Sequence, residues 1–428
     1  MQEPRAENRI LDDDFTALVV PRFLRYVKIW TTSDRHIEET PSSPGQWDLA
    51  RLLARELEGL GLEAAVSDHC YVVARLAASP GLEAKPAIGF LAHLDTAQDV
   101  SGKDVKPVLV EHYDGKKIVP GQPGRAGTAG GVCLDPETDP GLAAHRGKAI
   151  IHTDGTTLLG ADDKAGIAEI MGAVEYLCSR PEIKHGPVEI IFSPDEETGK
   201  GLPFFPLEKL TAAVCYTVDG GALGELEAEC FNAWSARVGF SGRVIHLGQA
   251  RGTLANACLM AASFAVMLPR SESPEATDTY YGYYCPTEIT GDLEKAELEV
   301  YIRDFDRARA EQRVAALRAF AAAVEAQFPG GSVTVEARPQ YYNMKEKISQ
   351  NPAVLAKLEE AARRTGITCS LKPIRGGTDG SKLTEMGIPT PNIFTGGRNF
   401  HSAAEWVSVP DMAAACRLIV ELAAVWAQ

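Results

Sequence analysis

The sequence lacks paired cysteines, long apolar runs and an excess of basic charge. Its nine cysteines include no CxxC pair, and several lie within apolar runs. An odd, unpatterned set of this kind predicts buried free thiols in a reducing compartment, and it argues against a disulfide framework or a zinc–thiolate site. No apolar stretch approaches the ~20 residues of a membrane span. The apolar C-terminal segment is interrupted by Arg417 and Glu421, which is typical of an amphipathic core helix.

The charge of the chain also narrows its range of partners. The 58 acidic residues outnumber the 43 basic ones, and the formal net charge is -15. Nucleic acids and anionic membrane surfaces both require a basic patch, so neither is expected as a partner. The first residues, MQEPRAENRILDDDF, are polar and acidic, unlike a secretory or transit peptide. We therefore expect a cytoplasmic protein.

The pattern of apolar residues predicts a domain of the α/β class. A chain of 428 residues is too long for one ordinary core, so two domains are expected. Helical spacing from about residue 15 to 61 is followed by apolar strands such as AIGFLAH, KAIIHT and VEIIFS, with the helix KAGIAEIMGAVEYLCS among them. This alternation predicts a mixed, mostly parallel sheet with helices on both faces. The Gly- and Pro-rich stretch 101–146 is expected to form a small hairpin or a border of the active site.

A different pattern begins near Phe231. The segment NAWSARVGFSG alternates like a half-exposed strand, and a helix, two strands, a long helix and the strand SVTVEAR follow. The order β-α-β-β-α-β is that of a ferredoxin-like α+β unit. Because the α/β pattern returns after Tyr342, we predict a discontinuous catalytic domain, residues 1–230 and 344–428. A lid or dimerisation-type domain, residues 231–343, is inserted into it.

Five apolar segments end in residues that commonly bind metals. The segments are GFLAHLD (His93, Asp95), TLLGADDKAG (Asp162, Asp163), IIFSPDEETGK (Asp195, Glu196, Glu197), CYTVDGG (Asp219) and NIFTGGRNFH (His401). Each apolar stretch is interpreted as a buried strand, and ligands of open α/β sheets bind where such strands end. Imidazoles and carboxylates gathered at one edge would repel each other without a cation among them. The sequence therefore predicts a pair of divalent metals.

Each motif also has a simpler explanation. His-x-Asp is common in surface turns, an Asp before a helix is a good cap, and three adjacent acids are usually solvated. Two residues apart on a strand, Asp95 and His93 would share a face, so Asp95 could hold the second ring nitrogen of His93. Neighbouring glutamates point apart, so one could bind metal while the other faces a water as general base. We interpret the remaining histidines as structural or exposed: His36, His69, His112, His145, His152 and His185.

The motifs that carry these residues are similar to those of a known family. They are PSSPGQW (41–47), AIGFLAHLDT (87–96), TDGTTLLGADDKAGIAEI (153–170), PDEETGKG (194–201), YTVDGG (216–221), RDFDR (303–307), YYNMKEK (341–347) and KPIRGGTDG (372–380). From about Phe15 onward the chain resembles the peptidase T family of tripeptide aminopeptidases. That family belongs to the co-catalytic zinc peptidases, with carboxypeptidase G2 and the aminoacylases.

The resemblance implies a role for each site residue. Two zinc ions per subunit would share Asp162, with His93 and Asp219 on the first and Glu197 and His401 on the second. Asp95 would orient His93, and Glu196 would act as general base and then as general acid. The positions that match substrate-contacting residues of the family are His246, Asn256, Arg303 and Arg375.

One position departs from the family pattern. Peptidase T has His-Pro-Gly where this chain has His246-Leu247-Gly248, which implies a looser turn at His246. Residues 1–14 match nothing in the family that we recognise.

The expected function is cleavage of the N-terminal residue from short peptides, most of all tripeptides, with a homodimer as a further expectation. A related di-zinc dipeptidase or N-acyl amino acid amidohydrolase is the alternative. A non-catalytic binding protein would have lost Glu196 or a ligand. A nucleotide-binding protein would need a Gly-rich turn between a strand and a helix, and GQPGRAG (121–127) follows no convincing strand.

Overall fold

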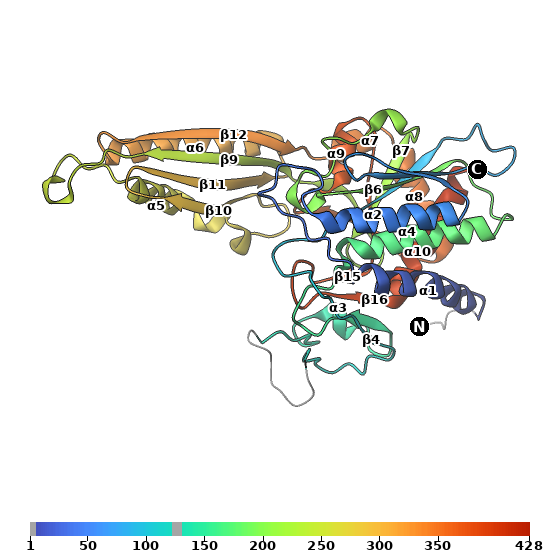
Figure 1. Ribbon diagram of the computed structural model, residues 1–428. Helices are drawn as coiled ribbons and strands as arrows, with labels where there is room; N and C mark the ends of the chain where they lie inside the picture. The colour runs from blue at the N-terminus through green and yellow to red at the C-terminus, as the bar shows by residue number, and fades with distance from the viewer. Residues whose placement is uncertain (1–5, 122–130) are drawn as a thin grey trace. The chain divides into compact units, whose positions relative to one another are not determined.

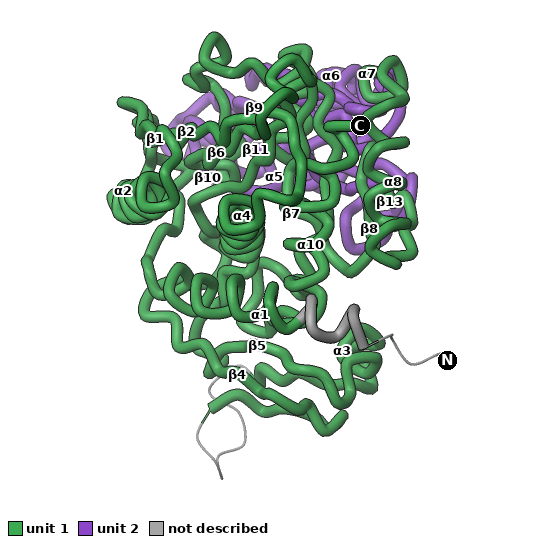
Figure 2. Tube along the Cα trace, turned by 90° about the vertical axis from the view of Figure 1, so that its right-hand side faces the viewer, with its two compact units in different colours: residues 1–228, 347–372, 378–428 green, residues 229–346, 373–377 purple. Residues whose placement is uncertain are grey.

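A computed structural model describes residues 6–121 and 131–428, with the backbone alone for residues 6–12. The chain divides into two compact units, coloured separately in Figure 2. Unit 1 comprises Met1–Ala228, Lys347–Lys372 and Thr378–Gln428, and unit 2 comprises Glu229–Glu346 and Pro373–Gly377. Most of the Gly-rich segment 121–127 lies outside the described residues.

Unit 1 is built on an eight-stranded sheet with the order β1-β2-β6-β3-β7-β14-β8-β13. The strands are β1 (Glu63–Val66), β2 (Val72–Leu76), β3 (Ile88–His93), β6 (Val188–Ser193), β7 (Val214–Gly220), β8 (Glu225–Cys230), β13 (Ser370–Ile374) and β14 (Asn392–Phe394). The central strands β6, β3, β7 and β14 are parallel, and antiparallel pairs flank them. This arrangement confirms the predicted mixed α/β sheet.

Helices cover both faces of this sheet (Figure 1). The large layer contains α1 (Ala6–Tyr26), α2 (Pro44–Gly59), α4 (Ala161–Ser179), α8 (Ala353–Thr365) and α10 (Val409–Trp426). Phe90 of β3 points into this layer, whereas its neighbour Leu91 packs with Leu383 of α9 (Asp379–Glu385) in a separate core cluster. Because side chains alternate along a strand, the two clusters lie on opposite faces. Every residue of β3 and β6 is buried, as expected for strands covered on both sides.

Unit 1 also contains a second, four-stranded sheet with the order β15-β16-β5-β4. Its strands are β4 (Val108–Val110), β5 (Ile150–His152), β15 (Gly397–Arg398) and β16 (Trp406–Ser408), and the short helix α3 (Pro140–Ala143) belongs to the same region. The expectation that KAIIHT joins the main sheet was wrong. Strand β5 pairs antiparallel with β4 and with β16, which occupy both of its edges.

Unit 2 is a four-stranded antiparallel sheet with two helices packed on one face (Figure 1). Its elements are β9 (Asn232–Ser241), α5 (Ala257–Met267), β10 (Tyr283–Gly291), β11 (Lys295–Asp304), α6 (Arg307–Gln327) and β12 (Ser332–Tyr341), with α7 (Lys345–Ser349) beginning at its end. The chain order β-α-β-β-α-β and the strand order β10-β11-β9-β12 are those of the predicted ferredoxin-like unit. Strand β9 alternates between buried and exposed residues because helices cover only one face.

The cysteines and the apolar helices were the two features for which the composition gave an expectation. None of the nine cysteines forms a disulfide; only Cys70, Cys215, Cys230 and Cys416 are buried, and Cys178 and Cys258 are exposed. The expectation of buried thiols therefore holds for part of the set. Within the part of the chain that the structure describes, no helix is long and apolar enough to cross a membrane.

Candidate metal centre

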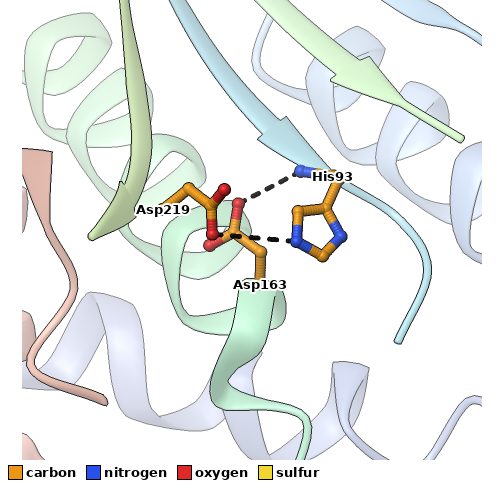
Figure 3. Close-up of side chains that lie close together, drawn as sticks. All are labelled: His93, Asp163 and Asp219. Carbon is orange, nitrogen blue, oxygen red and sulfur yellow. Dashed lines mark hydrogen bonds and ion pairs between the residues drawn. The ribbon is translucent and has the colours of Figure 1, made fainter. Parts of the chain in front are cut away.

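His93 is the last residue of β3 and lies beside Asp163 of α4 and Asp219 of β7 (Figure 3). Its Nε2 atom is 2.9 Å from Asp162 Oδ1 and 3.7 Å from Asp219 Oδ1. Its backbone N–H donates to Asp163 Oδ2 at 3.1 Å. The imidazole is buried, with 2% of the side chain exposed, so its position is set by the surrounding protein. Asp219 lies near the end of β7, which neighbours β3 in the sheet.

Asp162 lies between the two predicted histidines. Its Oδ2 atom is 3.2 Å from His401 Nε2, whereas its Oδ1 atom faces His93. The same His401 nitrogen is 3.0 Å from Glu197 Oε1. The structure therefore brings all five predicted ligands together in unit 1: His93, Asp162, Glu197, Asp219 and His401.

The donor atoms fit a divalent metal. Two groups have ligand atoms within 4.8 Å of one another: His93 with Asp163 and Asp219, and His93 with Asp162 and Glu197. Asp163 Oδ1 is buried and accepts no hydrogen bond from the described residues, which is costly for a carboxylate unless a cation lies beside it. Imidazole nitrogen and carboxylate oxygen are ligands that zinc and similar ions accept. Asp163, for which the sequence suggested either a helix cap or a metal ligand, thus belongs to the group formed with His93 and Asp219.

The ionisation of these groups reflects crowded negative charge. Burial raises the pKa of Asp219 to about 6 and that of Glu197 to about 7. Although burial opposes it, hydrogen bonding to Asp162 and Glu197 raises the pKa of His401 to about 11. Both histidines lower the pKa of Asp162 against the effect of its burial. Glu197, Asp219 and His401 therefore hold their protons more tightly than free side chains do, as expected of carboxylates grouped without a metal cation.

Each histidine has a further acidic neighbour at its other ring nitrogen. His93 Nδ1 is 3.3 Å from Asp95 Oδ1, and His401 Nδ1 is 3.4 Å from Asp99 Oδ2. The Asp95 contact agrees with the geometry expected from a spacing of two residues. Asp99 was not predicted, because it lies in a loop where no periodicity relates it to His401. Contacts of this kind fix ring orientation and tautomer in metal sites.

The loop that carries the three adjacent acids is held from two sides. The Asp195 carboxylate accepts the Ser42 backbone N–H at 2.7 Å and the Gln46 side-chain amide at 2.8 Å. The backbone N–H groups of Glu196 and Glu197 donate to the Asp95 carboxylate at 3.0 and 3.1 Å. These bonds give the PSSPGQW motif a physical role, because Ser42 and Gln46 anchor the acidic loop. The Asp195 side chain thus stabilises the loop, and the side chains of Glu196 and Glu197 are not used for this purpose.

The segment before Asp162 differs from its predicted form. We expected TLLG to be a strand, but residues 157–160 form a loop that leads into α4. The backbone N–H groups of Leu159, Gly160 and Asp162 donate to the buried Glu405 carboxylate, at 2.7, 2.8 and 3.1 Å, so they take no part in a strand ladder. Gly160 has φ 81°, which favours glycine. The peptide bond between Asp162 and Asp163 is cis.

Two buried acids near the site, Glu405 and Asp379, were not predicted from the sequence. Glu405 follows His401 by four residues in HSAAEW, and a lone acid before an aromatic strand gave no signal. Asp379 is only 2% exposed. Its charge raises the pKa of Glu196, although burial is the larger cause of that increase. The GGTDG motif contained Asp379 but did not indicate its burial.

The predicted substrate-contacting residues all lie in unit 2. His246 is exposed, and its Nδ1 accepts the Gly248 N–H at 3.2 Å. Asn256 caps α5 by accepting the Leu259 N–H at 3.3 Å. Arg303 is buried and donates to the carbonyls of Trp234 and Ile302. Arg375 belongs to the short segment Pro373–Gly377, where it donates to the backbone of residues 277, 279 and 281.

Among the other histidines, His145 differs from expectation in one respect. The sequence did not indicate an acidic partner for it, but its Nε2 atom lies 3.2 Å from Asp411 Oδ2. Its Nδ1 atom pairs with the Gly141 carbonyl, so the residue links α3 to α10. The rings of His152 and His185 pair with nearby backbone carbonyls. These contacts are structural, as predicted for this set.

The chain is similar to known proteins over most of its length. Residues 151–425 match the sequence profile of the peptidase family M20/M25/M40. Peptidase T of Geobacillus thermodenitrificans (strain NG80-2) is 46% identical over 405 residues, which cover 94% of this chain and 97% of that protein.

Solved structures agree at the level of the fold. Aminopeptidase PepT of Bacillus cereus ATCC 10987 superposes with a TM-score of 0.72 at 22% identity, covering 96% of this chain and 99% of that one. A dinuclear metal binding peptidase of the M20 family from Bacillus subtilis gives a TM-score of 0.63 at 15% identity, with 96% and 98% covered.

Two histidines and several carboxylates gather beside the ends of strands β3 and β7 of a mixed α/β sheet, as a metallopeptidase requires. The chain belongs to the peptidase family M20/M25/M40. Within that family it belongs to the peptidase T group, because identity to curated peptidase T sequences is near 45% over almost the whole chain. The predicted resemblance and the predicted enzyme class, a metallo-aminopeptidase, are confirmed.

Proposed function

We propose that this protein removes the N-terminal residue from tripeptides, using two zinc ions held by His93, Asp162, Glu197, Asp219 and His401. The observation that carries the proposal is the position of Asp162, whose two carboxylate oxygens face different histidines at 2.9 and 3.2 Å. A carboxylate in that position can bridge two metals. His93 and Asp219 would complete one site, and Glu197 and His401 the other. Asp163 has a ligand atom within 4.8 Å of those of His93 and Asp219, and it also accepts the backbone N–H of His93.

A bound metal pair supplies positive charge that polarises the scissile carbonyl and lowers the pKa of a water molecule toward ~7. The residues around it orient the reactants and move the proton. Asp95 holds the His93 ring through Nδ1 and anchors the backbone of both glutamates. The acidic loop is therefore fixed relative to the first histidine before substrate binds.

Glu196 is the residue proposed to transfer the proton. It accepts a proton from the attacking water and delivers it to the nitrogen of the departing amine. Burial raises the pKa of Glu196 well above its ordinary value, with Asp379 among the neighbouring charges that add to the shift. A raised pKa makes the protonated form a competent acid near neutral pH. Glu197, the next residue, faces His401, so the two glutamates have different neighbours.

In unit 2 we propose that His246, Asn256, Arg303 and Arg375 contact the substrate, as the family resemblance implies. Arg303 already donates to two backbone carbonyls and lies about 5.0 Å from the Tyr301 ring, which fixes the direction of its guanidinium group. His246 is exposed and its Nδ1 accepts the Gly248 N–H, whereas no side chain or backbone group of the described residues bonds to its Nε2, which can therefore face a substrate.

A panel of di-, tri- and tetrapeptides with free or blocked amines, combined with metal analysis, tests the proposed function. We expect tripeptides with a free amine to be cleaved fastest. Preference for dipeptides or N-acyl amino acids would instead favour the related amidohydrolases. The free thiols support a cytoplasmic location, and light scattering of the purified protein tests the expected homodimer.

The Glu196→Ala variant tests the proton-transfer role. It should retain both metals and lose nearly all turnover, with the exposed Glu58→Ala as a matched control. A Glu196→Ala variant within about tenfold of normal kcat, a difference of ~1.4 kcal/mol in barrier, would exclude Glu196 as the general base.

A further inference from the structure

His401 lies in a loop where its side chain is only partly buried. The loop joins β15 to β16, and 41% of the His401 side chain is exposed. Asn399 and His401 both have φ 56°, in the left-handed region that is unfavourable for residues other than glycine. The Ser402 hydroxyl donates to the Asn399 carbonyl at 2.6 Å, which closes the loop locally. Such a backbone persists only where surrounding contacts hold it.

The first of these contacts is made by Glu405. Its carboxylate is 1% exposed and accepts the backbone N–H groups of Leu159, Gly160 and Asp162. Glu405 thereby connects the loop that carries His401 to Asp162, whose carboxylate lies 3.2 Å from the His401 ring. The two residues of this contact are therefore also linked through the hydrogen bonds of Glu405.

The second contact comes from Asp139, at the start of α3. Asp139 Oδ2 accepts the Trp406 indole N–H at 3.0 Å and the Asn399 side-chain amide at 3.2 Å, one from each end of the loop. Its Oδ1 atom accepts the Leu142 N–H at 3.0 Å, which caps α3. Asp139 therefore connects both ends of the His401 loop to the Gly- and Pro-rich region 101–146.

We propose that Glu405 and Asp139 are positioning residues that hold His401 against Asp162 and so determine the affinity of the second metal site. The inference rests on the proposed metal function. Neither carboxylate is among the predicted ligands, and each already accepts hydrogen bonds from three N–H groups. Loss of either carboxylate leaves N–H donors unpaired and releases the loop that carries His401. Residues that hydrogen-bond to metal ligands or hold them in place typically contribute 10–100-fold to metal affinity.

The test uses Glu405→Gln and Asp139→Asn, which keep size and shape but replace an acceptor oxygen by a donor. Glu189→Gln is the matched control for Glu405, because the buried Glu189 accepts the N–H groups of Thr211 and Ala212 away from the site. Asp135→Asn is the control for Asp139, because Asp135 accepts the Glu137 N–H in the same region. Zinc per subunit is measured on the full chain, and zinc affinity is measured by titrating the metal-free protein.

We expect one of two zinc equivalents to bind about 10–100-fold more weakly in Glu405→Gln and in Asp139→Asn, with the other equivalent retained. Both controls should bind as the unmodified protein does. Excess zinc should restore turnover to the variants, an effect that general unfolding would not produce. If Glu405→Gln does not fold, Glu405→Asp and Asp139→Asn carry the test.

Two outcomes separate this inference from the proposed function. If the unmodified protein binds two zinc ions but Glu405→Gln and Asp139→Asn bind both within twofold of normal affinity, the positioning role is wrong and the metal site stands. If the unmodified protein binds no zinc, the proposed function itself fails.

Discussion

The carboxylate of Asp95 accepts the backbone N–H of Glu196 at 3.0 Å while its Oδ1 atom lies 3.3 Å from His93 Nδ1. One fully buried side chain thus fixes both a proposed metal ligand and the proposed general base. Strand β3 ends just before Asp95, and the acidic loop follows the adjacent parallel strand β6. The pairing of these two strands brings together residues about a hundred positions apart.

The first prediction concerns this relationship. Asp95→Asn should lower kcat about 10–100-fold, because the amide cannot accept the same set of N–H donors and the His93 ring loses its anionic partner. Steady-state kinetics measure the effect, with the exposed Asp68→Asn as control. An Asp95→Asn variant with normal kcat would show that neither His93 nor Glu196 depends on Asp95.

Removal of the shared carboxylate should affect both metals. Asp162 contacts both histidines, so Asp162→Ala should lose most of both zinc equivalents, whereas Glu197→Ala should lose mainly one. Elemental analysis of the dialysed proteins measures the difference. Two zinc ions retained in Asp162→Ala would exclude the bridging role.

Metal removal should reduce stability, and more so at higher pH. In the metal-free protein, burial raises the pKa of Glu197 to about 7 and of Asp219 to about 6, above their unfolded values. The unfolded chain therefore releases these protons first as pH rises, and stability falls between about pH 4 and 7. His401, whose pKa is raised to about 11, contributes stability that begins to be lost above about pH 6.5, which is the same direction.

Calorimetry with chelator or excess zinc at pH 5.5 and pH 8 measures this effect. Zinc at a concentration about a thousandfold above its Kd at pH 5.5 should stabilise the fold by about 4 kcal/mol per site at that pH. The same zinc concentration should raise Tm further at pH 8, where the ligands are deprotonated and the Kd is lower. An equal or smaller gain at pH 8 would contradict the proposed ionisation of the cluster.

A fourth prediction concerns the close approach of α4 to β7. A Cβ atom at Gly166 would lie 1.8 Å from the Val218 carbonyl oxygen and 2.4 Å from Asp163 Oδ1. Because backbone cannot move aside cheaply, Gly166→Ala should destabilise the protein by about 3 kcal/mol and weaken metal binding. Gly59→Ala is the control, since no atom lies within 4 Å of its added carbon and it ends α2. Denaturant unfolding that shows equal stability for both variants would contradict this packing.

Much of the architecture was predictable because local sequence patterns encode it. The apolar runs before His93, Glu197 and Asp219 predict buried strands that are followed by polar residues. Parallel strands bring their carboxyl ends, and so these polar residues, to one edge of the sheet. The two-residue alternation from Asn232 onward likewise indicated a sheet covered on one face. These features depend on periodicity within a few residues.

Tertiary structure decided what no local pattern contains. The partners Asp99, Asp139 and Glu405 lie in loops, and their hydrogen bonds join segments that are distant in sequence. The pairing of β5 with β16 rather than with the main sheet was likewise decided by strands more than two hundred residues apart. The sequence by itself determined which side chains could bind metal. The fold decided how firmly each is held, because hydrogen bonds to loop backbone form only once the chain is packed.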